Sequence, residues 1–252
     1  DAQIIHFGGD EVVFAQHVVH GARVLPGVAY LELARQAAQR VGSGDPVGMR
    51  LENVVWTTPL SAGTAGAPVP VDIRVLLDQD ERGAHRFEIQ SRVSARNGSE
   101  QAWRTHAQGR ARPDSGSPPQ QLDLSALRTR CPSDFSSDRL YALYDQLGLA
   151  YGPAFRSVVA IRVGADELLV ELDAGASRDA EFSRWVIHPG MLDGAQQAAL
   201  ALHWGEAGGG AELPFALQSL SILRPCPPRA VAWVRFGSNS GSGTAIRSLD
   251  ID

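Results

Sequence analysis

The sequence of 252 residues contains no lysine, so all 23 of its basic residues are arginines. This absence excludes a Schiff base or a lysine base within the chain. We attribute it to the codon bias of a GC-rich bacterial genome. Cysteine is scarce too: Cys131 and Cys226 are the only two, and neither lies in a CxxC pair. The sequence therefore predicts neither a structural zinc site nor a disulfide framework, and it favours the reducing cytoplasm.

Long apolar runs and excess positive charge are also missing. The chain has no stretch of about 20 apolar residues and no charged start before an apolar run, so we expect neither a membrane span nor a signal peptide. The net charge of -5 and the absence of a basic stripe argue against nucleic acid or an anionic membrane as a partner. The abrupt start, DAQIIHFGGDE without an initiating methionine, resembles an excised piece of a longer protein.

Two apolar helices share the same start and stop signals. Pro26-Gly27 and Gly42 enclose a helix expected at residues 28–41, and Pro189-Gly190 and Gly205 enclose a second one. The matched spacing predicts an internal duplication, with a chance match of the Pro-Gly starts as the alternative. With 44% hydrophobic residues, the chain can bury its core as one large domain or as two small ones.

Strand-like runs rich in valine, isoleucine and other β-formers accompany these helices. In the first half, we expect strands at residues 48–60, 69–77, 87–93 and 102–111. In the second half, we expect a helix at 137–147, a hairpin at 157–163 and 168–172, and strands at 217–223, 230–236 and 245–251.

Proline, glycine and serine gather in PDSGSPPQQ, residues 113–121, which indicates a linker. The predicted organisation is a first domain at 1–112, a linker at 113–133 and a second domain at 134–252. Each domain is expected to be α+β, with one long apolar helix wrapped by an antiparallel sheet.

His17, in HVVHGARVLPG, is a candidate general base. Gly21 and Pro26 fix the backbone of the loop that would position its imidazole, a group that suits proton abstraction at neutral pH. Two alternatives stay open at this point. His17 is also a reasonable core histidine beside Val18 and Val19, and His20 competes with it for the role of base.

Asp193, in HPGMLDGAQQ, is a candidate general acid. Its apolar neighbours would desolvate the carboxyl and favour the protonated form that can donate a proton. Gln197 lies one helical turn later on the same face and can hold the carboxyl or a substrate hydroxyl. The alternative is a first-turn aspartate favoured by the helix dipole.

Two further segments supply candidate supporting or substrate-binding residues, and the second of them is the candidate pocket wall. YGPAF supplies Tyr151, Gly152, Pro153 and Phe155, although an ordinary turn with a packed aromatic ring explains it equally well. Leu213, Pro214 and Phe215 begin a predicted strand. His188 is interpreted as a helix-entry residue rather than as a second base.

Four motifs now stand in one order: HxxxGxxxxP at residues 17–26, YGP at 151–153, DxxxQ at 193–197 and LPF at 213–215. Together they resemble the motifs of dehydratase domains from modular type I polyketide synthases. The resemblance implies a double hot-dog fold, with His17 as base, Asp193 as acid and Gln197 supporting the aspartate. The chain departs from the family at Gln16, where many members have an acidic residue, and it stops at Asp252, near where further strand is expected.

The activity implied by the resemblance is dehydration of a 3-hydroxyacyl thioester to a 2-enoyl thioester. The substrate would be carried on the phosphopantetheine of an acyl carrier protein, with no intrinsic metal or redox cofactor. Expected partners are that carrier, the neighbouring synthase domains and a second copy in a homodimer. Because the chain is acidic and carrier proteins are typically acidic too, Arg156, directly after YGPAF, is a candidate contact for the carrier. A solvated surface arginine is the alternative for Arg156. Alternatives are a dehydratase that also closes a pyran by adding an internal hydroxyl, a double-bond isomerase, a thioesterase, and a silent dimerisation or docking module.

Overall fold

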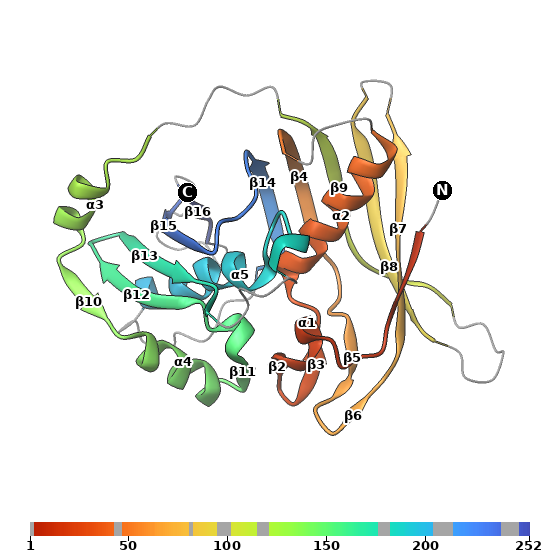
Figure 1. Cartoon of the computed structure of the whole chain (residues 1–252), viewed down its shortest axis with the longest axis horizontal. Coiled ribbons are helices and arrows are strands. Elements are labelled where there is room, and N and C mark those ends of the chain that lie inside the picture. Colours follow the sequence, from red (N-terminus) through yellow and green to blue (C-terminus); the bar gives the residue numbers. More distant parts are fainter. Residues whose placement is uncertain are drawn as a thin grey trace. The chain divides into compact units, whose positions relative to one another are not determined.

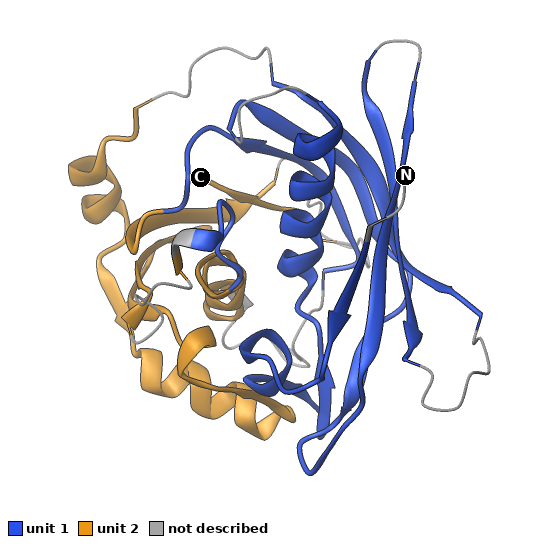
Figure 2. Cartoon of the chain, turned by 45° about the vertical axis from the view of Figure 1, so that its right-hand side comes forward, with its two compact units in different colours: residues 1–116, 183–189, 213–226 blue, residues 117–182, 190–212, 227–252 orange. Residues whose placement is uncertain are grey.

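The computed structural model describes residues 3–42, 47–80, 83–94, 102–114, 121–175, 182–203, 214–237 and 247–252. The chain divides into two compact units, coloured blue and orange in Figure 2. The first unit comprises residues 1–116, 183–189 and 213–226, and the second comprises 117–182, 190–212 and 227–252. In the part of the chain that the structure describes, no helix is long and apolar enough to cross a membrane.

The first unit is built on one antiparallel sheet of six strands. Their order is β1 (Gln3–Phe7), β7 (Val71–Gln79), β8 (His85–Val93), β9 (Arg104–Pro113), β4 (Met49–Trp56) and β14 (Ala216–Ile222). Burial alternates along β8, where Phe87 and Ile89 are buried while Arg86 is exposed. This period of two gives the sheet one apolar face.

Helix α2 (Gly27–Val41) packs on that face against β4, β7, β8 and β9, as Figure 1 shows. Val28 through Arg35 are all buried, so these first turns of the helix are enclosed around their whole circumference. Pro26 is the N-cap, and the indole nitrogen of Trp56 donates to the Gly27 carbonyl oxygen at 3.1 Å. The expected helix at 28–41 is confirmed, one residue longer at its start.

A smaller antiparallel sheet is formed by strands that come before and after α2 in the sequence. It follows α1 (Val12–Ala15) and contains β2 (His17–Val19), β3 (Ala22–Val24), β5 (Ser61–Thr64) and β6 (Ala67–Pro68). The turn between β2 and β3 has two residues, His20 and Gly21, with φ of 47° and 81°. Two consecutive positive φ values define a type I′ hairpin turn, in which glycine is favoured at the second position.

The second unit is built on a five-stranded antiparallel sheet. Its order is β10 (Ser133–Phe135), β12 (Val158–Val163), β13 (Glu167–Asp173), β15 (Arg229–Phe236) and β16 (Leu249–Ile251). Its other elements are α3 (Leu124–Arg130), α4 (Ser137–Gln146), β11 (Leu149–Tyr151), η1 (Pro153–Phe155), most of α5 (Pro189–Gln197) and η4 (Ala198–His203). A short turn, η3 (Phe182–Arg184), spans the boundary between the units. The expected hairpin and the helix at 137–147 are confirmed.

The expected linker at 113–133 differs from the structure. Residues 124–130 form helix α3, and the Asp123 carboxylate caps it by accepting from the backbone nitrogens of Ser125 and Ala126, each at 3.0 Å. An aspartate before LSALRTR is an ordinary helix-start signal that the prediction overlooked.

The expected second domain at 134–252 differs as well, because β14 belongs to the first unit. This strand pairs with β4 from Ala216↔Val55 to Ile222↔Met49, which satisfies the backbone groups of β4 on that side. The duplicated helix also differs from expectation, since regular α-helix ends at Gln197 and continues as the 3-10 turn η4. Gly205, its expected stop, lies outside the described residues.

The type I′ turn predicts that Gly21→Ala destabilises the protein. An added Cβ would meet no atom within 4 Å, so the cost is the left-handed backbone conformation alone, about 1–2 kcal/mol in the free energy of unfolding. Gly66→Ala is the matched control, because Gly66 also has open space but no positive φ. Urea unfolding of both variants measures the difference, and equal stabilities would contradict this account.

Candidate active site

His17 is the first residue of β2, and its side chain is buried with 7% of its surface exposed. Its Nδ1 lies 2.9 Å from the carbonyl oxygen of Val24, in the strand β3 that pairs with β2. A carbonyl oxygen only accepts hydrogen bonds, so Nδ1 must carry the hydrogen. In the neutral ring, the lone pair then belongs to Nε2, and this nitrogen is the one that can accept a proton.

The hairpin separates the two candidate bases. His20 is exposed at the tip of the turn with Gly21, whereas His17 is buried and has its tautomer set by Val24. Pro26 is buried where α2 begins. The HxxxGxxxxP motif therefore covers a hairpin and the start of a helix. His17 supplies the imidazole, Gly21 lies in the hairpin turn and Pro26 is the N-cap of α2.

Asp193 and Gln197 share one face of α5, and both side chains are buried. The Gln197 amide nitrogen donates to Asp193 Oδ2 at 2.6 Å and to the carbonyl oxygen of Phe155 at 3.1 Å. Since both partners accept, the amide orientation is determined. Its other atom, Gln197 Oε1, is buried and has no hydrogen-bond partner among the described residues. The expected pairing of the carboxyl with the glutamine is confirmed.

The YGPAF segment lies against this pair. Tyr151 ends β11, and Phe155 is buried at the end of η1 with its carbonyl bound to Gln197. The Tyr151 ring makes edge-to-face contacts with Tyr144 at 5.2 Å and Tyr141 at 6.5 Å between ring centroids. Burial is the main cause that raises the pKa of Tyr144 and Tyr151, so both phenols stay neutral at neutral pH.

The sequence analysis missed the side chains that hold α5 in place. The Tyr144 hydroxyl donates to the Gln197 carbonyl oxygen at 2.9 Å, and the Ser157 hydroxyl donates to the Gly190 carbonyl oxygen at 2.8 Å. The amide of Val158 donates to the Tyr141 hydroxyl at 3.1 Å. Tyr141 and Tyr144, three residues apart in α4 and therefore on one helix face, were the available signal.

Arg156 serves the same segment. Its Nε donates to the Tyr151 carbonyl oxygen at 2.8 Å, its Nη2 lies 3.4 Å from an Asp145 carboxylate oxygen, and its guanidinium stacks over the Tyr141 ring at 5.0 Å. Its role as a carrier contact stays a prediction. Because these contacts hold YGPAF, reversing its charge would disturb that segment as well.

The LPF motif is only partly described. Leu213 lies outside the described residues, and Pro214 and Phe215 come just before β14 rather than within it. Phe215 is 54% exposed, and its carbonyl oxygen accepts from the backbone nitrogen of Trp56 at 3.0 Å. Its assignment to a pocket wall stays a prediction.

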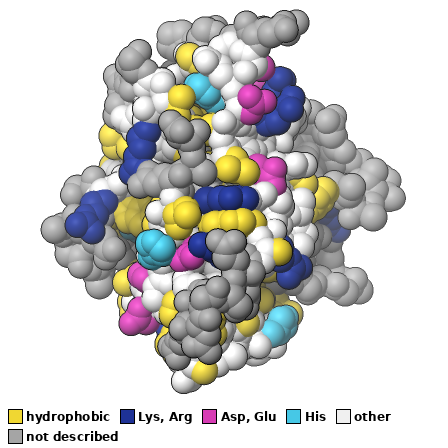
Figure 3. All heavy atoms as spheres, turned by 90° about the vertical axis from the view of Figure 1, so that its right-hand side faces the viewer, with side chains coloured by type: hydrophobic (Ala, Val, Ile, Leu, Met, Phe, Trp, Pro, Cys, Tyr) yellow, Lys and Arg dark blue, Asp and Glu magenta, His cyan; other side chains and the backbone are white. Residues whose placement is uncertain are grey.

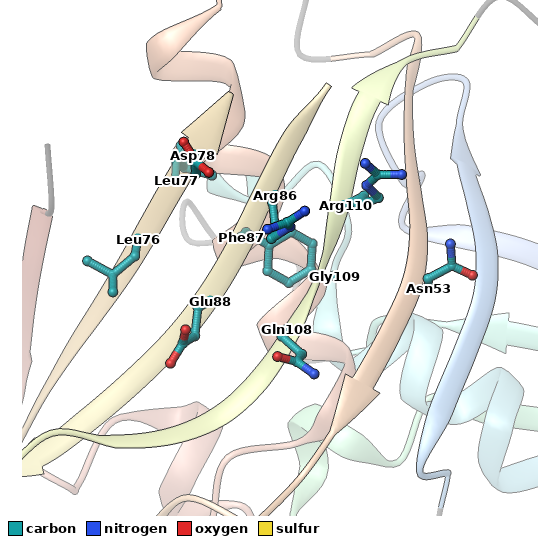
Figure 4. Close-up of a pocket in the computed structure, with 10 residues that line it drawn as sticks. All are labelled: Asn53, Leu76, Leu77, Asp78, Arg86, Phe87, Glu88, Gln108, Gly109 and Arg110. Carbon is teal, nitrogen blue, oxygen red and sulfur yellow. The ribbon is translucent and has the colours of Figure 1, made fainter. Parts of the chain in front are cut away.

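The first unit also has a groove of about 570 Å³, which lies on strands of the six-stranded sheet (Figure 4). It is lined by Asn53, Leu76, Leu77, Asp78, Arg86, Phe87, Glu88, Gln108, Gly109 and Arg110, from β4, β7, β8 and β9. None of the candidate residues lines it.

On the face shown in Figure 3, the described basic and acidic side chains are interspersed rather than gathered into one patch. Among the described residues, no group of three His, Cys, Asp or Glu side chains could hold a metal ion.

His188 directly precedes Pro189, the first residue of α5, which is the helix-entry position expected for it. It is buried, and loss of hydration lowers its pKa to about 4. The ring is therefore neutral at neutral pH.

Two antiparallel units, with a tautomer-fixed histidine in one and an amide-held carboxyl in the other, define a double hot-dog domain. Residues 119–252 match the family described as "Polyketide synthase dehydratase N-terminal domain", and residues 5–92 match "Polyketide synthase dehydratase domain". The chain belongs to this family, the dehydratase domains of modular type I polyketide synthases.

Individual relatives agree with this membership. The chain is 32% identical to polyketide synthase PksM and 36% identical to PksN, both from Bacillus subtilis (strain 168), in each case over 98% of its length. It spans only 6% of PksM and 4% of PksN. A crystal structure of a trans-AT PKS dehydratase domain from Brevibacillus brevis is 34% identical, with a TM-score of 0.87 over 100% of this chain and 87% of that one.

The contact between Ser157 and Gly194 predicts a compensating pair of substitutions. A Cβ at Gly194 would lie 2.0 Å from Ser157 Oγ, so Gly194→Ala should cost about 1–3 kcal/mol or more in stability. Ser157→Ala removes one buried hydrogen bond, worth about 1 kcal/mol, and leaves the nearest Ser157 atom, Cβ, at 3.4 Å. The double variant should therefore be more stable than Gly194→Ala alone in thermal unfolding. Additive losses would contradict the contact.

Burial of His188 predicts a loss of stability in mild acid. The folded pKa, about 4, is below the ordinary 6.5, so the unfolded chain binds more protons between these values. Stability is complete above about pH 6.5 and falls toward pH 4 by up to about 3 kcal/mol. His188→Gln should flatten this slope in unfolding experiments. The slope that remains comes from His106, whose pKa burial also lowers, and from carboxylates such as Glu167, whose pKa is lowered mainly by its hydrogen bond with Arg130. An unchanged slope would refute the assignment.

Proposed function

We propose that this domain removes water from a 3-hydroxyacyl thioester on the phosphopantetheine arm of an acyl carrier protein, which gives a 2-enoyl thioester. The observation that carries the proposal is the hydrogen bond from His17 Nδ1 to Val24, because it makes Nε2 the proton-accepting atom of a buried ring. Family membership supplies the reaction class.

His17 and Asp193 divide the two proton transfers. His17 Nε2 takes the proton from the carbon next to the thioester carbonyl, and the electrons of that bond form the new double bond. The bond between the neighbouring carbon and its hydroxyl breaks while Asp193 protonates the departing oxygen, so one water leaves. His17 is then protonated by the proton from the substrate carbon, and Asp193 has lost its proton to the departing water. Exchange of protons with solvent restores both groups.

The surroundings of Asp193 suit the role of acid. Gln197 donates to Oδ2 and thereby orients the carboxyl. Burial favours the neutral, protonated form of a carboxyl. The unpartnered Gln197 Oε1 is a buried acceptor suited to the substrate hydroxyl. Backbone N–H groups at the Gly21 turn or the first turn of α5 are the candidates for stabilising charge on the thioester oxygen.

The proposal requires no metal or redox cofactor from this chain, since the phosphopantetheine belongs to the carrier. The acyl carrier protein, neighbouring synthase domains and a second copy in a homodimer are the proposed partners. The relatives' much greater length supports the presence of neighbouring domains. Neither Cys131 nor Cys226 is in a disulfide, which supports a cytoplasmic setting.

Substitution of either proton-transfer group should abolish most turnover. We expect His17→Ala and Asp193→Asn each to slow dehydration of a carrier-bound 3-hydroxyacyl substrate by about 10²–10⁴-fold, the usual contribution of general acid–base catalysis. His20→Ala is the matched control and should retain the wild-type rate, because its side chain is exposed at the turn. Mass spectrometry of the carrier measures the loss of water, and thermal unfolding verifies that each variant folds.

A wild-type rate in His17→Ala or Asp193→Asn would remove that residue from the mechanism. A carrier-bound 3,7-dihydroxyacyl substrate separates the related activities: an open enoyl product supports dehydration alone, and a pyran shows that the same domain also closes a ring. Release of free acid would indicate a thioesterase. If the wild-type domain converts none of these substrates, the silent docking module is the better description.

A further inference from the structure

Glu32 is a carboxylate in the middle of the core helix α2, and none of its surface is exposed. It forms a bidentate ion pair with Arg35, whose Nε and Nη2 each donate at 2.8 Å, and it accepts from the Gln36 amide at 3.0 Å. Arg35 is only 3% exposed. A buried ion pair loses favourable hydration on folding, a loss that apolar side chains in the same place would not have. A gain in folding stability is therefore a weak explanation for the presence of this pair.

The same carboxylate also binds the backbone of a segment far away in sequence. The amide nitrogen of Ile187 donates to Glu32 Oε2 at 3.0 Å, and that of Val186 donates to Oε1 at 3.4 Å. Both amides belong to a stretch without regular structure, where a buried N–H needs an acceptor from elsewhere. On its other side, the Val186 carbonyl oxygen accepts from the backbone nitrogen of Cys226 at 2.9 Å.

This segment leads directly into the helix of the proposed acid. Pro189, two residues after Ile187, begins α5, which carries Asp193 and Gln197. Because the proline ring fixes the φ angle of Pro189, the position of the residues before it constrains the direction in which α5 starts. Residues 183–189 belong to the first unit with Glu32, so the chain is anchored there at the point where α5 starts.

We propose that Glu32 is a positioning residue, which holds residues 186–187 and thereby the start of the helix that carries Asp193. The positive charge of Arg35 compensates the negative charge of Glu32, and the backbone amides of Val186 and Ile187 are the groups that Glu32 holds in place. The catalytic consequence rests on the proposed function. A shift of about 1 Å at a reacting group can cost up to about 10²-fold in rate, so a loosened helix start is expected to act on kcat.

Glu32→Gln tests the proposal, with Asp72→Asn as the matched control. Asp72 is also a buried carboxylate of the first unit, where it accepts from Ser94 Oγ at 2.6 Å and Arg92 Nε at 3.1 Å, but it binds nothing in residues 186–187. Glu32→Gln should increase deuterium uptake at residues 186–193 and lower kcat by about 10–100-fold with a smaller change in KM. Asp72→Asn should leave both readouts as in wild type, whatever its effect on the melting temperature.

A milder variant serves if Glu32→Gln does not fold. Glu32→Asp keeps a charge for Arg35 and withdraws the carboxylate by one methylene from the two amides, and it should change both readouts in the same direction. Unchanged deuterium uptake in the Glu32 variants would overturn the proposal, as would increased uptake with a wild-type kcat. Exchange needs no turnover, so greater uptake in an enzyme without dehydratase activity would support the anchoring while rejecting the proposed function.

Discussion

Burial of α2 against one face of an antiparallel sheet is the constraint on which the first unit depends. Val28 and Leu31 have no exposed surface, and Ile73 and Ile89 on the facing strands are equally enclosed. Each such side chain contributes about 1.5–3 kcal/mol by leaving water. The same enclosure forces every polar group on the helix to find a partner within the protein. Glu32 has several, and two of them are backbone amides just before α5.

The two candidate catalytic groups are prepared in different ways. His17 depends on a short hairpin, since the strand that returns after Gly21 brings the Val24 carbonyl to its ring and selects one tautomer. Asp193 depends on a helix and its supports, since Gln197 orients the carboxyl and is itself held through Phe155 and Tyr144. A backbone acceptor is hard to change by mutation. A side-chain network can be altered one residue at a time, so the acid is the more adjustable half of the pair.

The packing around α5 explains why position 194 is a glycine. A side chain there would overlap the Ser157 hydroxyl, which binds the first turn of α5. The residue after the proposed acid is therefore constrained by packing rather than by chemistry. Gly21 is constrained by its backbone conformation instead, because nothing lies near its missing side chain. Two glycines beside the two catalytic candidates thus act through different physical effects.

The sequence alone determined the α+β class, helix α2, the β12–β13 hairpin and the spacing that pairs Asp193 with Gln197, because these depend on local periodicity and turn residues. It missed α3 inside the expected linker, although Asp123 was a visible cap. Only the tertiary structure assigned β14 to the first unit, the His17 tautomer to Val24, and the amides of Val186 and Ile187 to Glu32. These depend on contacts between residues distant in sequence or on atoms of the backbone, neither of which leaves a periodic pattern in the sequence.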